Sequence, residues 1–176
     1  DSPGVIELVQ TLLAAGQAQC VLGNHELSVL RGAPKPGNGW FFAENHDHHK
    51  RRFPHSRGAS AEQREQFPQF LASLPLALSR DDLRVVHAAW HPASLLALAA
   101  DAGSQPLTDI YREYGRHAEQ WAQESALKHA AGNEYRLWHA QLDDEHASVP
   151  LLQAIGRMDE HFQMSNPVRV LTSGVE

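Results

Sequence analysis

The segment Gly23-Asn24-His25-Glu26 contains side chains that are suited to phosphoryl chemistry. It directly follows the apolar run Cys20-Val21-Leu22, which predicts a turn from a short strand into a helix. A glycine allows the backbone to bend tightly at such a turn, and the N–H groups that open the helix favour a phosphate. The turn would present an amide oxygen, which can bind a metal, beside an imidazole, which can donate a proton near neutral pH.

A second histidine follows another β-rich run. Residues 83–86, Leu-Arg-Val-Val, predict a short strand, and His87 comes directly after it in the segment His87-Ala88-Ala89-Trp90-His91-Pro92. An imidazole nitrogen at the end of a strand is a suitable ligand for Mn, Fe or Zn. His87 is therefore the second candidate group for a metal site.

Taken together, these segments resemble the calcineurin-like metallophosphoesterases, in which a Gly-Asn-His-Asp/Glu block is followed by a metal block ending in histidine. The spacing looks closest to the branch of diadenosine tetraphosphate hydrolases and serine/threonine protein phosphatases. The resemblance implies a hydrolase of phosphate esters or phosphoanhydrides that uses water activated by two divalent ions, Mn, Fe or Zn. It implies Asn24 and His87 as ligands of the second metal and His25 as proton donor to the leaving group. The substrate would be a small phosphorylated compound, a nucleotide or a phosphoprotein.

Other blocks of that family do not occur in the sequence. These are Gly-Asp-x-His-Gly, Gly-Asp-x-x-Asp-Arg-Gly and a later Gly-His-x-His-like block. We therefore expect residues 1–176 to form the central part of a single metallophosphoesterase domain, with residues 107–164 as a helical cap or a packing layer. Two alternatives follow: a catalytically inactive nucleotide- or partner-binding fragment that lacks the first-metal ligands, and a helical interaction protein whose histidines are incidental.

Hydrophobic periodicity predicts helices with short strands between them. The first helix begins at Ser2-Pro3 and ends at Gly16. Further helices are expected over residues 24–30, 62–74, 92–100 and 149–164, and within 107–142 on either side of Gly132-Asn133. Strands are expected at 18–22 and 168–171, and a hairpin at 76–79 and 83–87. With the resemblance, this order predicts an incomplete α/β fold: a two-sheet sandwich flanked by helices, with residues 33–60 as a partly helical insertion.

Each candidate residue also has a structural interpretation. Asn24 could cap a helix, because an amide is common at that position. His91 is a candidate substrate contact or a residue at a helix start before Pro92, and Arg31 is a candidate phosphate clamp or a solvated surface charge. The same two readings apply to Arg51, Arg52 and Arg57. The cluster His46, His48 and His49 favours a solvated loop over a metal site, because it lacks regular spacing.

Composition limits the class of protein. The chain has 176 residues, of which 42% are hydrophobic, enough to bury a core. Fifteen Lys and Arg against 21 Asp and Glu give a net charge of −6, which argues against a nucleic-acid coating protein. No run approaches the roughly 18 apolar residues of a membrane span. The single cysteine, Cys20, is expected to pack as a small hydrophobe. We expect a cytoplasmic protein.

Overall fold

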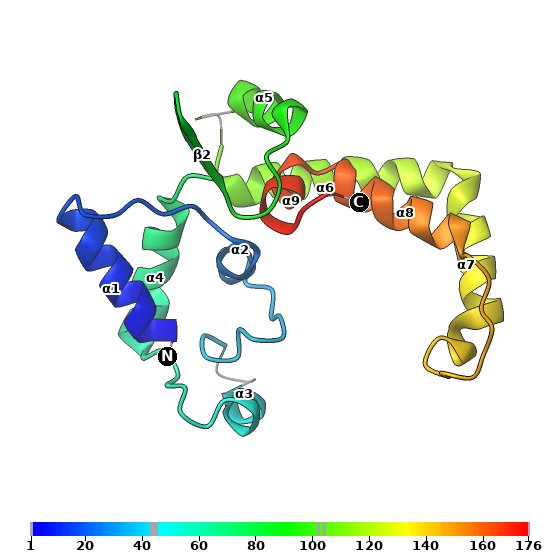
Figure 1. Cartoon of the computed structure of the whole chain (residues 1–176), viewed down its shortest axis with the longest axis horizontal. Coiled ribbons are helices and arrows are strands. Elements are labelled where there is room, and N and C mark those ends of the chain that lie inside the picture. Colours follow the sequence, from blue (N-terminus) through cyan, green and yellow to red (C-terminus); the bar gives the residue numbers. More distant parts are fainter. Residues whose placement is uncertain (1, 43–45, 102, 104, 176) are drawn as a thin grey trace. The chain divides into compact units, whose positions relative to one another are not determined.

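A computed structural model describes residues 2–42, 46–101, 103 and 105–175, and these residues are mostly helical (Figure 1). The chain divides into two compact units. Unit 1 comprises the described part of residues 1–90 together with 171–173, and unit 2 the described part of 91–170 and 174–176. Whether residues 107–164 act as a cap stays a prediction.

The predicted two-sheet sandwich is wrong. Within the described residues the sheet has two antiparallel strands, β1 (Ala77–Arg80) and β2 (Leu83–Val86), with Ala77 paired with Val86 and Arg80 paired with Leu83. They form the hairpin that the sequence predicts. No strand is present at residues 18–22 or 168–171, so the strands needed for two stacked sheets are missing from the described chain.

Both runs take up other structures, in which the buried side chains are Leu22, Val168, Val170 and Leu171. Residues 168–171 lie in helix α9 (Pro167–Ser173), where the Asn166 side chain accepts hydrogen bonds from two backbone N–H groups and Pro167 begins the first turn. Residues 18–22 are extended without a partner strand, and the Leu22 N–H donates to the Pro75 carbonyl at 2.9 Å. A short buried run has the same composition in a strand, a helix or an extended segment, so its pattern does not decide between them.

Unit 1 places four helices and the hairpin around one core. Its helices are α1 (Ser2–Ala14), α2 (Asn24–Leu30), α3 (His46–Arg52) and α4 (Ala61–Ala72). Helix α4 packs against both α1 and α2 (Figure 1). Phe67 and Leu71 of α4 are each 1% exposed, and the ring of Trp40 lies 6.3 Å from that of Phe67. The loop before α3 is thereby anchored to the core.

Local sequence explains the start of α4. Ser60 and Gln63 form a capping box, in which the Ser60 hydroxyl accepts from the Gln63 N–H and the Gln63 side chain accepts from the Ser60 N–H. Pro68 lies inside this helix rather than at its start. The predicted α1, α2 and α4 are confirmed, with small differences at their ends.

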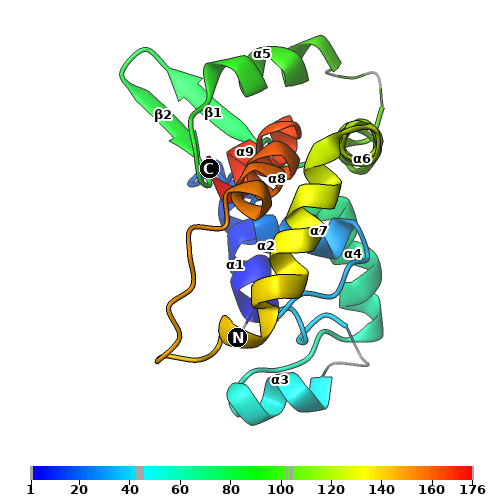
Figure 2. The ribbon, with the colours of Figure 1, turned by 90° about the vertical axis from the view of Figure 1, so that its right-hand side faces the viewer.

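Unit 2 is helical. It contains α5 (Pro92–Asp101), α6 (Leu107–Glu124), α7 (Ala126–Trp138), a 3₁₀ turn (His139–Gln141), α8 (Gln153–Met164) and most of α9. Helix α8 packs against α6 and α7, which places Met158 in a cluster with small alanines (Figure 2). The break between α6 and α7 falls at Ser125, whose backbone is extended. The predicted break at Gly132-Asn133 is wrong, because α7 continues through these residues.

Candidate functional site

The turn before α2 puts the Gly-Asn-His-Glu segment at the start of a helix. Gly23 is the residue that precedes the first helical turn, with φ −102° and ψ 175°, and Asn24 is the first helical residue. The Asn24 side chain therefore does not cap α2, and among the described residues its amide has no hydrogen-bond partner. The capping explanation for Asn24 is excluded, and the amide is available to a ligand.

His87 lies against this turn although it is far away in the sequence. A β-carbon placed on Gly23 would be 2.7 Å from Glu26 Oε2 and 2.8 Å from His87 Nδ1. The Glu26 carboxylate and the His87 ring thus occupy the space that any other residue at position 23 would fill. The Ala88 N–H donates to the Leu171 carbonyl at 3.0 Å, which holds the chain just after His87.

His25, Glu26 and His87 share one cavity of unit 1, and Asn24 is not among its lining residues. It has a volume of about 340 Å³ and includes three ionisable side chains, those of His25, Glu26 and His87. Its other lining residues are Ser2, Val5, Ile6, Gly37, Asn38 and Trp40. His87 is exposed and His25 and Glu26 are half-buried, so a solute can reach all three.

Asn38 fixes the orientation of His25. The Asn38 Nδ2 donates to the His25 carbonyl at 2.8 Å, which leaves Oδ1 of Asn38 as an acceptor, 2.8 Å from His25 Nδ1. The proton of the neutral ring therefore belongs on Nδ1, and Nε2 is the nitrogen left to exchange protons with a ligand. Asn38 is 1% exposed, so water does not compete for these bonds. Asn38 is not among the residues that the sequence suggested. The only indication of it in the sequence is its place as a polar residue between two glycines just before Trp40.

Replacing Asn38 with alanine is expected to release this ring. The free energy of unfolding should fall by about 1–3 kcal/mol, because the part-buried His25 carbonyl loses the hydrogen bond from Asn38. Nitrogen-15 NMR of His25 should show the Nδ1–H tautomer in the wild type and a mixture of tautomers in Asn38→Ala. Asn38→Asp keeps an acceptor for Nδ1 and serves as the matched variant; a wild-type tautomer in Asn38→Ala would contradict the orienting role.

Two predicted substrate contacts lie elsewhere. Arg31 follows the end of α2, is exposed and does not line this cavity. His91 belongs to unit 2, where its Nδ1 accepts from the Ser94 N–H at 3.3 Å and lies 2.8 Å from the Ser94 hydroxyl. His91 therefore occupies the start of α5, as its structural interpretation predicted, and part of its ring is used in holding that helix.

His49, His161 and the cysteine have structural surroundings. Residues 46–52 form α3 rather than the predicted loop, and His49 is buried, with Nε2 3.0 Å from the Ser56 hydroxyl. His161 stacks on Trp121 with ring centres 3.8 Å apart. Burial, assisted by the negative charge of Glu26, raises the pKa of the Cys20 thiol, so it stays protonated near neutral pH.

The metal-ligand atoms around Gly23 match part of the ligand set of a divalent ion. The His87 imidazole and the Glu26 carboxylate lie together, and the unpartnered Asn24 amide is next in sequence to Gly23. Nitrogen and oxygen donors in this mixture are typical of Mn, Fe or Zn sites. In the described residues no group of three His, Cys, Asp or Glu is placed to hold an ion, so these residues fit part of one coordination sphere.

The comparisons with known proteins add no relative. No protein-family model matches the chain, and no match was found among curated proteins or among solved structures. None of the described helices is long and apolar enough to cross a membrane.

Proposed function

We propose that the chain belongs to a metal-dependent phosphoesterase in which His25 is the proton donor. The observation that supports this is the meeting of two distant segments: the turn at Gly23 packs against His87, and His25, Glu26 and His87 line one accessible cavity. The resemblance pairs these same two segments in one site. A helical interaction protein would have no need to bring them together around a glycine.

The chain's own residues have separable roles in this proposal. In its imidazolium form, with Nδ1–H held by Asn38, His25 donates the proton on Nε2 to the departing oxygen and is left as the neutral Nδ1–H ring. Glu26 lies in the first turn of α2, where its carboxylate interacts favourably with the helix dipole. The cavity walls that Ile6 and Trp40 supply are apolar and partly exclude water, which strengthens the interactions of the charged groups inside.

Asn24 and His87 are the residues that would hold a metal, with Glu26 as a further donor beside His87. Bound divalent ions supply Lewis-acid activation of water and charge neutralisation at the phosphoryl group. The two-metal arrangement rests on the family resemblance, since the blocks that carry the first-metal ligands are not in this sequence.

The experiment is a phosphatase assay on the full-length gene product that carries this sequence. Hydrolysis of bis(p-nitrophenyl) phosphate should require Mn²⁺, be lost with EDTA and return on adding the metal. His87→Ala and Asn24→Ala should each weaken Mn²⁺ binding in a titration, whereas His129→Ala, which changes an exposed histidine of α7, should not.

Two results would reject the enzyme. Metal binding without hydrolysis of any phosphoester would favour the inactive, nucleotide- or partner-binding alternative. A protein that takes up no Mn²⁺ and is unchanged by Asn24→Ala would favour the helical interaction protein.

A further inference from the structure

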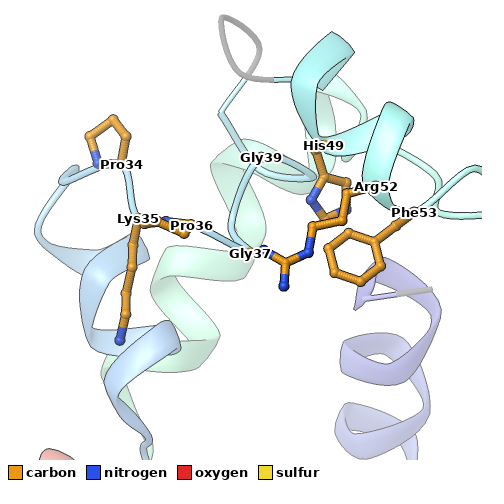
Figure 3. A pocket seen from close by; sticks show the side chains of 8 residues that line it. All are labelled: Pro34, Lys35, Pro36, Gly37, Gly39, His49, Arg52 and Phe53. Atoms are coloured by element: carbon orange, nitrogen blue, oxygen red, sulfur yellow. The ribbon is translucent and has the colours of Figure 1, made fainter. Parts of the chain in front are cut away.

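Two more cavities of unit 1 lie beside the His25 cavity. The first, of about 240 Å³, lies between the loop of residues 34–39 and helix α3 (Figure 3). The second, of about 420 Å³, extends along residues 52–56. Both are lined by Gly37, His49, Arg52 and Phe53, so these four residues form their common wall.

Gly37 connects these cavities with the His25 cavity, because it lines all three. Its φ of +94° favours glycine, and a β-carbon there would be 3.1 Å from Cε1 of His25. The backbone therefore approaches the imidazole closely with no side chain between them. A ligand that reaches His25 can extend past Gly37 into the neighbouring cavities.

The lining of the two neighbouring cavities is basic. Among the described residues it contains Lys35, Arg52, His49 and His55 and no carboxylate, in a chain whose net charge is −6. Within the described part of the chain, neither Lys35 nor Arg52 has an ion-pair partner. Cations such as Lys35 and Arg52 in a concave surface attract an anion.

Arg52 is also held in place. Its guanidinium lies over the ring of Phe53, with Cζ 5.6 Å from the ring centre, and that ring lies 4.9 Å from the imidazole of His49. Figure 3 shows the Arg52 side chain beside these two rings, with its guanidinium toward Gly37. A guanidinium that is stacked on a ring keeps its planar face of donors for two oxygens of one phosphate.

We propose that Arg52 forms a second phosphate-binding site, separate from His25. Phosphate would bind to the Arg52 guanidinium in the cavity next to Gly37, whose lining also includes Lys35. The role of this site in catalysis rests on the proposed function: it would bind a phosphate of the substrate that is not hydrolysed. Binding of inorganic phosphate itself does not depend on hydrolysis.

The test is calorimetric titration of the metal-free protein with inorganic phosphate at low ionic strength. Arg52→Ala should weaken binding about tenfold, the size expected for one charge-assisted hydrogen bond. Arg51→Ala is the matched control, because Arg51 is the neighbouring residue of α3, carries the same charge and lines neither cavity. It should bind phosphate as the wild type does. Arg52→Lys should fall between the two, because it keeps the charge and loses the planar fork.

Three results would overturn the second site: no phosphate binding by the wild type, an equal loss in Arg51→Ala and Arg52→Ala, or a loss in His25→Ala as large as in Arg52→Ala. The last result would place the anion at His25. Circular dichroism of each variant confirms that the fold is retained. Phosphate binding that depends on Arg52 would support this site even if the phosphoesterase assay fails, so the two proposals are tested separately.

Discussion

Replacing His25 with alanine is expected to lower kcat for phosphoester hydrolysis by about 10²- to 10⁴-fold, the usual contribution of a positioned acid or base. The reason is the geometry of the ring: Asn38 Oδ1 lies 2.8 Å from Nδ1 and holds that N–H, so the imidazolium form donates its Nε2 proton in the cavity that Glu26 and His87 also line. The measurement is steady-state hydrolysis with saturating Mn²⁺. KM should change little, because the proton transfer is made in the transition state.

The loss should depend on the leaving group. A p-nitrophenolate leaves readily without a proton, so His25→Ala should retain more activity on p-nitrophenyl esters than on alkyl phosphates. His117→Ala is the control, since His117 is an exposed histidine of α6. An equal loss on both kinds of ester would contradict the proton-donor role and would indicate that His25 supports the site in another way.

The sequence predicted the local elements of unit 1 better than their assembly. Helices α1, α2 and α4 have caps or breakers at their ends, and the hairpin has a charged turn between two apolar runs, so local rules were sufficient. The sandwich required strands at 18–22 and 168–171. In those runs the buried side chains are Leu22, Val168, Val170 and Leu171, and what covers them is decided by distant residues, which periodicity does not report.

Only those residues of the candidate site that belong to a sequence motif could be predicted. The Gly-Asn-His-Glu segment and His87 could be selected from their positions after apolar runs, and the structure places Gly23 and His87 in contact. Asn38 lies in a segment rich in proline and glycine, and its role depends on burial against His25. Arg52 could not be distinguished from Arg51 by sequence, because only the fold shows which of them faces the cavities.

Replacing Gly23 with alanine should test the contact between the two segments directly. At φ −102° and ψ 175° an alanine adopts this backbone without strain, so the effect comes from the added β-carbon alone. That carbon would lie 2.7 Å from Glu26 Oε2 and 2.8 Å from His87 Nδ1, closer than atoms can approach, so both side chains must shift. Activity should fall about 10²-fold, as expected for a small misplacement of reacting groups.

Stability should respond much less than activity. Both displaced groups are ends of side chains that solvent can reach, so they can move without disturbing the core, and the free energy of unfolding should change by no more than about 1 kcal/mol. Gly156→Ala, at an exposed position of α8 with nothing within 4 Å of the new carbon, is the matched control and should leave activity unchanged. Wild-type activity in Gly23→Ala would contradict a role in catalysis for the close approach of Glu26 and His87 to the turn.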